Sequence, residues 1–192
     1  MTCRAVLSIG SNQGDSLALL RGVVQRAAED AILRAVSSVY ATSPWGGVRQ
    51  EDFLNAILVV EHPGSPVDVL EWGFAREREA ERVREVRWGP RTLDVDVVSA
   101  ELDGEPVISD DPALTLPHPR AVERAFVLIP WLEIEPGALL HGTRVSDHLA
   151  ALEASSAGSA GGAGDADTDG AAAATAGVRR LDDPLTPTGW VS

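Results

Sequence analysis

Short apolar runs alternate with helical periodicities along the first part of the chain. Residues 5–9 form an apolar run that predicts a short buried strand, ended by a polar Gly-Ser-Asn triplet. Apolar residues then recur at helical spacing over residues 17–27, which predicts a helix with Asp15 or Ser16 at its N-cap. The chain is therefore expected to begin with a strand followed by an amphipathic helix.

Two more strands are predicted next. Residues 36–42 are rich in β-branched side chains and alternate in part, and residues 53–61 form a longer apolar run. Between them, residues 43–52 contain one proline and two glycines, which is typical of a loop.

Residues 66–82 predict a second helix. Pro66 suits the first turn of a helix, and Val67, Leu70 and Phe74 would share one face.

Residues 92–98 predict a fourth strand. Residues 101–108, with Asp103 and Gly104 at their centre, predict part of a hairpin. The resulting order β-α-β-β-α-β is the split βαβ arrangement of a ferredoxin-like α+β sandwich, here with extra C-terminal elements.

The composition changes near residue 153. We expect a folded domain over residues 1–153 and a flexible linker over residues 154–177, because nearly all of the latter are Ala, Gly, Ser, Asp or Thr. Residues 178–192 form a tail with four large apolar side chains, which either docks on the domain or remains loose. We expect removal of residues 155–192 to leave nearly all of the thermal stability.

Charge and hydropathy exclude several classes of protein. The 29 acidic and 16 basic residues give a net charge of -13, which would repel nucleic acid and anionic bilayers. Proline interrupts the longest apolar stretch, residues 125–132, which is far shorter than the roughly 20 residues of a membrane helix. The first apolar run is too short for a signal peptide, so we expect a cytoplasmic location.

Two residue types limit the available chemistry. All 16 basic residues are arginine, which excludes a Schiff-base lysine and a Walker A loop, so phosphate must be bound by Arg, His, backbone N–H groups or metal. The single cysteine, Cys3, excludes an internal disulfide and is interpreted as a small buried residue.

Asp94 and Asp96 are the strongest local signal. Alternation along a strand places both carboxylates on one side, where they repel each other unless a cation lies between them. Mg²⁺ typically takes one or two carboxylates together with substrate phosphates. Taken alone, such a pair is more often the solvated face of an edge strand.

The arginines before this strand change the interpretation. They are Arg76, Arg78, Arg82, Arg84, Arg87 and Arg91. Together with the acidic pair they indicate a metal-and-guanidinium clamp for a polyphosphate, as phosphoryl transfer requires. For Arg76 and Arg78 we favour a helix surface of Glu–Arg pairs instead.

Two further clusters carry candidate chemistry. His118 lies between two prolines, which fix its backbone and suit a side chain held toward an anion, although a lone His in a turn is more often structural. Trp45, Phe53 and Asn55 could bind a flat heterocycle by stacking and by a hydrogen bond to its edge. Phe53 in the core and Trp45 as a loop anchor is an equally good interpretation.

These motifs resemble the 6-hydroxymethyl-7,8-dihydropterin pyrophosphokinase family over roughly residues 4–136. The matching blocks are SIGSNQGD from residue 8, YATSPWG from residue 40 with Gln50 and the Phe-Leu-Asn run from residue 53, RWGPRTLDVDV from residue 87, and LTLPHPR from residue 114. The resemblance implies a ferredoxin-like fold. It also implies transfer of pyrophosphate from ATP to the hydroxymethyl group of the pterin, with release of AMP, in folate biosynthesis.

The resemblance also implies a role for residues at matching positions. Asp94 and Asp96 would hold two Mg²⁺ ions. Arg82, on a mobile loop, and Arg91 would be the catalytic contacts to the polyphosphate.

The positions that match ATP contacts are Glu77, Arg84, Trp88, Thr115, His118 and Arg124. The positions that match the pterin site are Thr42, Pro44, Trp45, Phe53, Asn55 and Phe126. Glu81, where a glycine commonly precedes Arg82, and Ala113, where a basic residue is common, depart from the pattern.

Two alternatives remain open from the sequence. A nucleotidyltransferase on a ferredoxin-like palm would also use paired aspartates and Mg²⁺, and a pterin-binding module would keep the pocket without turnover. The expected partners are ATP and a reduced pterin, with no nucleic acid and no membrane, and the expected state is a monomer.

Overall fold

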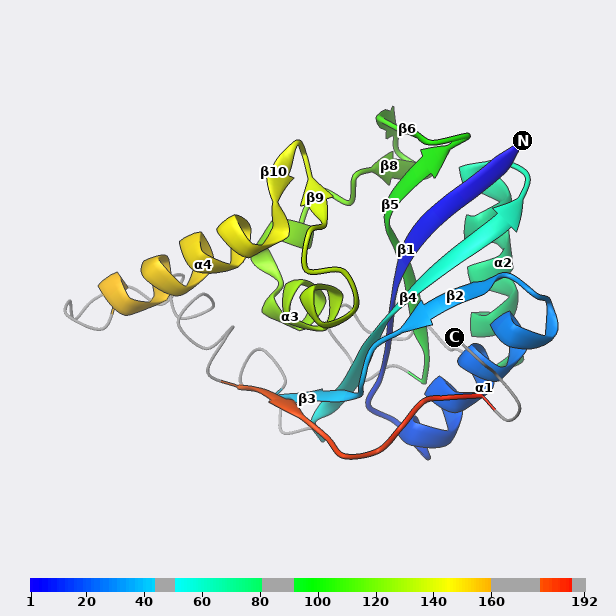
Figure 1. Cartoon of the computed structure of the whole chain (residues 1–192). Helices are drawn as coiled ribbons and strands as arrows, with labels where there is room; N and C mark the ends of the chain where they lie inside the picture. The colour runs from blue at the N-terminus through cyan, green and yellow to red at the C-terminus, as the bar shows by residue number, and fades with distance from the viewer. Residues whose placement is uncertain (44–50, 81–91, 160–176, 188–192) are drawn as a thin grey trace.

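The computed structural model describes residues 1–43, 51–80, 92–159 and 177–187, and helices lie on both faces of its main sheet (Figure 1). The helices are α1 (Ser16–Glu29), α2 (Pro66–Glu79), a 3-10 turn (Ala121–Glu123), α3 (Ala125–Ile134) and α4 (Val145–Ser159). The strands are β1 (Thr2–Ser11), β2 (Leu33–Val36), β3 (Tyr40–Thr42), β4 (Phe53–Pro63), β5 (Asp94–Leu102), β6 (Glu105–Pro106), β7 (Ser109–Asp111), β8 (Leu114–Leu116), β9 (Leu139–Leu140), β10 (Thr143–Arg144) and β11 (Val178–Arg180).

The main sheet has the order β11-β3-β4-β1-β5-β6, with β2 also paired to β4, and every pairing is antiparallel. Without the short outer strands, the order β3-β4-β1-β5 is that of the split βαβ arrangement. The predicted α+β ferredoxin-like class is therefore confirmed. The predicted hairpin is also present, because β5 and β6 pair around a turn at Asp103 and Gly104.

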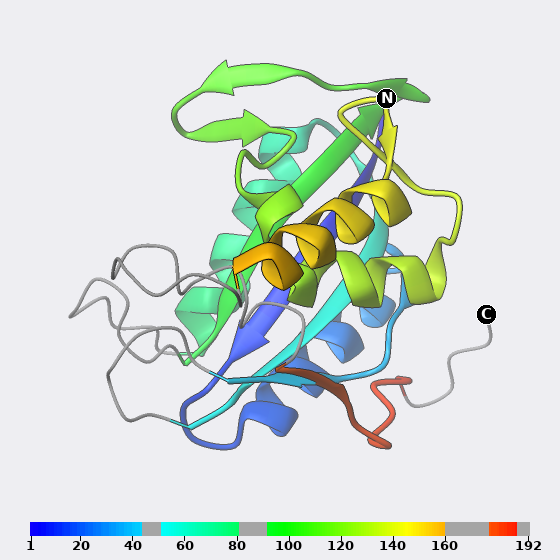
Figure 2. The same ribbon diagram turned by 90° about the vertical axis from the view of Figure 1, so that its left-hand side faces the viewer.

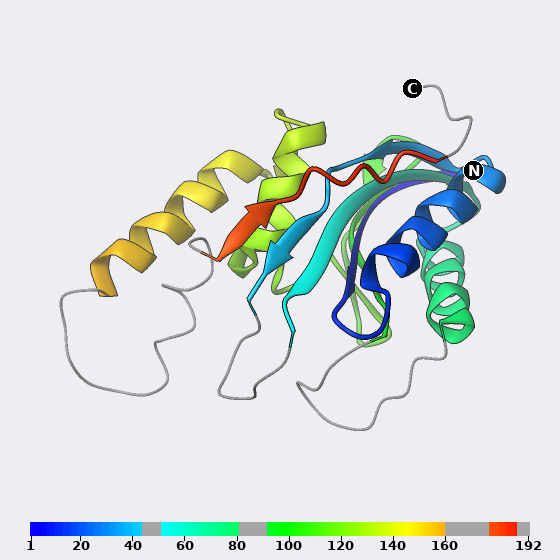
Figure 3. The same ribbon diagram turned by 90° about the horizontal axis from the view of Figure 1, so that it is seen from below.

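Each face of the sheet has its own core. Ala5, Leu7 and Ile9 of β1 pack with α1 and α2, whereas Val6 packs with α3 on the other side. Figure 3 shows the sheet between these two helical layers. Because successive side chains of a strand alternate between faces, this division also fixes the face that each polar residue of the sheet occupies.

The predicted strand over residues 36–42 is wrong, because two strands occupy this segment. β2 ends at Val36 and β3 begins at Tyr40. At the break, Ser37 bonds to Ile57 of β4 twice: its backbone N–H donates to the Ile57 carbonyl at 2.9 Å, and its hydroxyl accepts from the Ile57 N–H at 2.9 Å. The side chain of Ser37 thus replaces a backbone acceptor, and the chain leaves the strand geometry without losing a hydrogen bond.

The second helix begins as predicted, and Leu70 of the predicted face packs against the core, but Val67 of that face does not. Ser65 and Asp68 form a reciprocal capping box, and Pro66 occupies the first turn. Val67 is 56% exposed, whereas Val69 and Gly73 are buried. A Cβ at Gly73 would lie 3.0 Å from Val95 Cγ1, so glycine allows α2 to approach β5 closely. The predicted last turn, including Arg82, lies outside the described residues.

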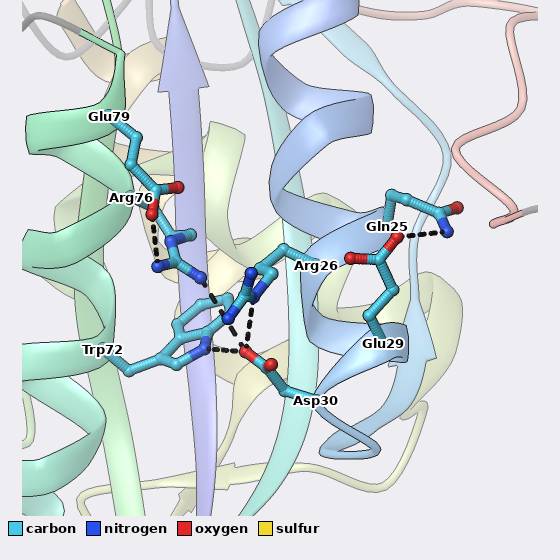
Figure 4. Close-up of polar contacts among 7 residues, drawn as sticks. All are labelled: Gln25, Arg26, Glu29, Asp30, Trp72, Arg76 and Glu79. Carbon is cyan, nitrogen blue, oxygen red and sulfur yellow. Dashed lines mark hydrogen bonds and ion pairs between the residues drawn. The ribbon is translucent and has the colours of Figure 1, made fainter.

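Arg76 is also placed differently from the prediction, because it is 8% exposed rather than on a solvated surface. Its guanidinium lies 5.2 Å from the centre of the Trp72 ring and donates to Glu79 at 2.8 Å. Figure 4 shows that Asp30, just after α1, completes the cluster. Asp30 accepts from Trp72 Nε1 at 2.9 Å and from Arg26 Nε at 3.0 Å. This cluster joins the C-terminal ends of α1 and α2.

The C-terminal segment docks on the domain. β11 pairs with β3, and Leu185 is 3% exposed in the core shared with α1 and α2. The structure therefore favours the docked alternative for residues 177–187. α4 continues to Ser159, so the first residues of the expected linker are helical, and residues 160–176 lie outside the described part. Among the described residues, none of the helices has the length and apolar character needed to cross a membrane.

Candidate active site

One row of residues crosses four strands on the α3 side of the sheet. In the strand register, Asp94 of β5 lies opposite Gly10 of β1, Gly10 lies opposite Asn55 of β4, and Asn55 lies opposite Tyr40 of β3. The next row on the same face pairs Asp96 with Ser8. The two aspartates and Asn55 therefore share one face, as predicted for the carboxylates, and Figure 2 shows that face with α3 in front of it.

Gly10 provides the space in this row. A Cβ at Gly10 would lie 2.8 Å from Asn55 Oδ1, a distance that real Cβ atoms essentially never show. Asn55 is 5% exposed, and its Nδ2 donates to the Thr42 hydroxyl at 2.7 Å. The amide of Asn55 is thus held between β1 and β3 with its orientation fixed. No role was expected for Gly10 from the sequence, although this residue lies within the first motif block.

The carboxylate pair meets the start of α3. Arg124 Nη1 donates to Asp96 Oδ2 at 3.1 Å, and both side chains are partly exposed, at 21% and 34% respectively. The same guanidinium lies 5.8 Å from the centre of the Phe126 ring. The structure therefore brings a residue of the predicted ATP set, a metal candidate and a residue of the predicted pterin set into one cluster.

His118 lies at the outer edge of β5. Its backbone N–H donates to the Val98 carbonyl at 2.8 Å, and its Nδ1 accepts from the Arg120 N–H at 3.1 Å. Burial lowers the pKa of His118, and the positive charge of Arg124 lowers it further. The imidazole is therefore neutral at pH 7 with its proton on Nε2, which leaves one N–H to donate to a ligand.

Glu77 of α2 is buried and contacts the same edge. Its carboxylate accepts a hydrogen bond from the N–H of Val95 at 3.0 Å. Val95 lies between Asp94 and Asp96 in the sequence, and Glu77 itself is 6% exposed. This contact satisfies an N–H on the outer edge of β5, so Glu77 helps to hold the strand that carries Asp94 and Asp96.

Thr115 makes a local hydrogen bond within the β7–β8 hairpin, from its hydroxyl to the Asp111 carbonyl at 3.1 Å.

The remaining predicted residues divide into two groups. Thr42 and Phe53 lie opposite each other on β3 and β4, next to Asn55, so the structure brings these three together. The other predicted positions lie outside the described residues: Pro44, Trp45, Arg82, Arg84, Trp88 and Arg91.

The donor set fits Mg²⁺ that is shared with a phosphate ligand. Among the described residues there is no group of three or more His, Cys, Asp or Glu side chains that could hold a metal alone. Two carboxylates on one face offer some of the oxygen ligands that a hard cation needs, and substrate phosphates or water must provide the others. Such a site is suited to a metal–polyphosphate substrate.

Comparison with known proteins agrees with this geometry. The family model for 7,8-dihydro-6-hydroxymethylpterin-pyrophosphokinase (HPPK) matches residues 6–136. The chain is 48% identical over 143 residues to the 2-amino-4-hydroxy-6-hydroxymethyldihydropteridine pyrophosphokinase of Mycobacterium tuberculosis, covering 71% of this chain and 75% of that protein. It is 43% identical over 154 residues to that of Methylorubrum extorquens, covering 79% and 95%.

A solved structure supports the same fold. The HPPK-DHPS of Plasmodium falciparum, with pterin and p-hydroxybenzoate, superposes with a TM-score of 0.60 at 12% identity. The match covers 94% of this chain but only 45% of that one, and at this identity it shows the fold alone. The family model and the closely similar bacterial enzymes carry the assignment further: the chain belongs to the HPPK family and is a diphosphotransferase of folate biosynthesis.

Proposed function

We propose that this chain transfers the pyrophosphoryl group of ATP to the hydroxymethyl group of 6-hydroxymethyl-7,8-dihydropterin and releases AMP. The observation that carries the proposal is the row in which Gly10, without a side chain, separates Asp94 from Asn55. A carboxylate for a metal–phosphate complex and an amide for a heterocycle edge thus face the same space across one strand. Both kinds of recognition are needed for this reaction.

In this proposal Asp94 and Asp96 hold two Mg²⁺ ions. When bound, the ions supply the positive charge that aligns and neutralises the phosphate oxygens of ATP. The backbone of β5 keeps the two carboxylates on one face, and Glu77 satisfies the N–H of Val95 between them. The chain thereby offers the carboxylates at a fixed separation before substrate binds.

Cationic and neutral donors complete the proposed polyphosphate site. Arg124 lies close enough to Asp96 to contact a phosphate that shares the metal ion proposed for this carboxylate. Neutral His118 donates from Nε2 without adding a charge. Arg82 and Arg91 are proposed as the catalytic arginines that stabilise charge on the transferred group. Glu77, Arg84, Trp88 and Thr115 complete the proposed ATP set.

The pterin is proposed to lie against the Asn55 end of the row. Phe53 and Phe126 would stack on the heterocycle, and the amide of Asn55 would bind its edge. The hydrogen bond from Asn55 to Thr42 fixes which way the amide presents its donors and acceptor. Pro44 and Trp45 complete the proposed pterin set.

The proposal also covers the state of the protein. We propose a monomer that works in the cytoplasm, where ATP and a reduced pterin are both available, with residues 1–153 as the pyrophosphokinase domain.

The nucleotide product tests the proposed reaction. The protein is incubated with ATP, Mg²⁺ and the reduced pterin, and the products are separated by chromatography. AMP and pterin diphosphate in equal amounts are expected, because attack at the β-phosphorus breaks the bond between the α- and β-phosphates. ADP would instead indicate transfer of the γ-phosphoryl group, and free pyrophosphate with an AMP-linked acceptor would indicate a nucleotidyltransferase. Either result would contradict the proposal.

A further inference from the structure

Glu133 of α3 is a point at which separate segments meet. Its carboxylate accepts from the Ser38 N–H at 2.8 Å, from the Ser38 hydroxyl at 2.7 Å and from the Tyr40 hydroxyl at 3.3 Å. Three donors therefore converge on one carboxylate. The hydroxyl of Tyr40 is correspondingly kept protonated, since burial and the charge of Glu133 raise the pKa of Tyr40. The carboxylate therefore ties α3 to the start of β3.

The C-terminal segment places the guanidinium group of Arg180 next to Glu133. Arg180 Nη2 lies 3.0 Å from Glu133 Oε1, and Arg180 Nε donates to the Ser38 hydroxyl at 2.9 Å. Backbone pairing places Arg180 there, because Arg180 lies opposite Tyr40 in the register of β11 and β3. Leu181 extends the attachment, donating its N–H to the Val39 carbonyl at 2.8 Å.

These contacts act on two of the elements that carry the proposed pterin site, β3 and α3. β3 carries Thr42, which fixes the amide of Asn55, and α3 carries Phe126. β3 has only three residues and would be the edge of the sheet without β11. A short edge strand is among the elements that open most readily, so its position depends on the contacts at its ends and sides.

We propose that Glu133 and Arg180 are a positioning pair that sets the separation of β3 from α3 and thereby the affinity for the pterin. The proposal gives the C-terminal segment a part in the reaction, although neither residue touches the reacting atoms. It rests on the assignment of the pterin to Asn55 and Phe126 made above. Since the side chain of Arg180 is 63% exposed, its ion pair contributes little to global stability, and its loss should appear in substrate binding instead.

The test uses the full chain with three single variants. Glu133→Gln and Arg180→Ala remove the ion pair from either side. Arg179→Ala is the matched control, because Arg179 is the neighbouring residue of β11, lies opposite Ala41 and is exposed. The Michaelis constant for the pterin, the Michaelis constant for ATP, kcat and the melting temperature are measured for each.

We expect Glu133→Gln and Arg180→Ala to raise the pterin KM by roughly three- to tenfold, with kcat and the ATP KM unchanged. Arg179→Ala should leave all of these values unchanged. The double variant should be no worse than the poorer single variant, because both remove one interaction. Arg180→Lys keeps the positive charge but loses the planar guanidinium group, so its affinity for the pterin should lie between those of Arg180→Ala and the unchanged protein.

Unchanged pterin KM values in both single variants would overturn the inference, as would equal increases in the pterin and ATP KM values. A lower melting temperature with normal kinetics would show a structural role only, and would overturn it too. Asn55→Ala reports separately on the proposed pterin site: if it raises the pterin KM while the other two variants do not, the site stands and the positioning pair fails.

Discussion

Arg124 donates a hydrogen bond of 3.1 Å to Asp96, from the start of α3 to the middle of β5. This contact joins two sequence blocks that are 28 residues apart and pairs one carboxylate of the acidic pair with a cation. The repulsion between Asp94 and Asp96 is thereby reduced in the free protein. A metal–phosphate ligand would offer the carboxylate a cation and the guanidinium an anion, so both partners can be satisfied again on binding.

Replacing either aspartate should abolish turnover. Asp94→Ala and Asp96→Ala each remove a proposed metal ligand, and we expect kcat to fall by roughly a thousandfold or more, the equivalent of about 4 kcal/mol. The fold should persist, because both side chains lie at a partly exposed face of the strand. Activity and thermal melting are measured together with Glu101→Gln, a control on the same strand. Near-normal activity in either aspartate variant would disprove the metal assignment.

Gly10→Ala should damage pterin binding more than folding. The added methyl group would meet Asn55 Oδ1 at 2.8 Å, so the amide must move away from Thr42. Losing a well-oriented buried hydrogen bond costs about 1–3 kcal/mol, so we expect kcat/KM for the pterin to fall roughly ten- to a hundredfold. Gly22→Ala, where a Cβ meets no atom within 4 Å, is the control and should keep full activity. Equal kinetics in the two variants would refute the role of Gly10.

Leu185→Ala should lower thermal stability. Leu185 is 3% exposed in the core beneath α1, and truncating a buried leucine costs about 2 kcal/mol or more, which lowers Tm by roughly 5 °C in a chain of this size. This reverses the expectation that residues 155–192 add almost nothing to stability. Val67→Ala, at a 56% exposed position, should leave Tm nearly unchanged. A melting curve of Leu185→Ala that matches that of Val67→Ala would show that the segment does not dock in solution.

Cys3 should resist thiol reagents while the protein is folded. Burial raises the pKa of Cys3 to about 11, and the nearby carboxylate of Asp68 adds to the shift. At pH 8 roughly one thiol in a thousand would then be the reactive thiolate, far fewer than in an unfolded chain, where the pKa is about 8.5. The labelling rate at pH 8 is compared with and without urea, and similar rates under the two conditions would contradict the burial.

The fold could be predicted because its signals are local. The apolar runs of β1 and β4, the periodicity of α1 and the turn at Gly104 each depend on a few neighbouring residues. The break between β2 and β3 could not be predicted, because it depends on a hydrogen bond that the Ser37 hydroxyl accepts from the N–H of Ile57, 20 residues away. Whether Leu185 docks could not be decided from the sequence for the same reason, since its site is formed by distant elements.

The candidate site was predictable in composition but not in arrangement. The alternation rule placed Asp94 and Asp96 on one face correctly. It could not show that Asn55 lies in the same row, because strand register is set by the whole sheet. Arg76 was misplaced because an alternation of Glu and Arg looks the same on a solvated helix as on one that faces Trp72 and Asp30.

The row through Gly10 fixes the distance between the backbone positions of Asp94 and Asn55, whether or not substrate is bound. Asp94 and Asn55 are separated by two strand spacings, about 10 Å, and this distance is maintained by backbone hydrogen bonds along all of β1. On the proposed assignment, a phosphate complex at one end and a heterocycle at the other would meet across a fixed gap. We therefore expect an acceptor alcohol whose arm is one carbon longer than hydroxymethyl to be a poorer substrate, because its oxygen would lie past the β-phosphorus.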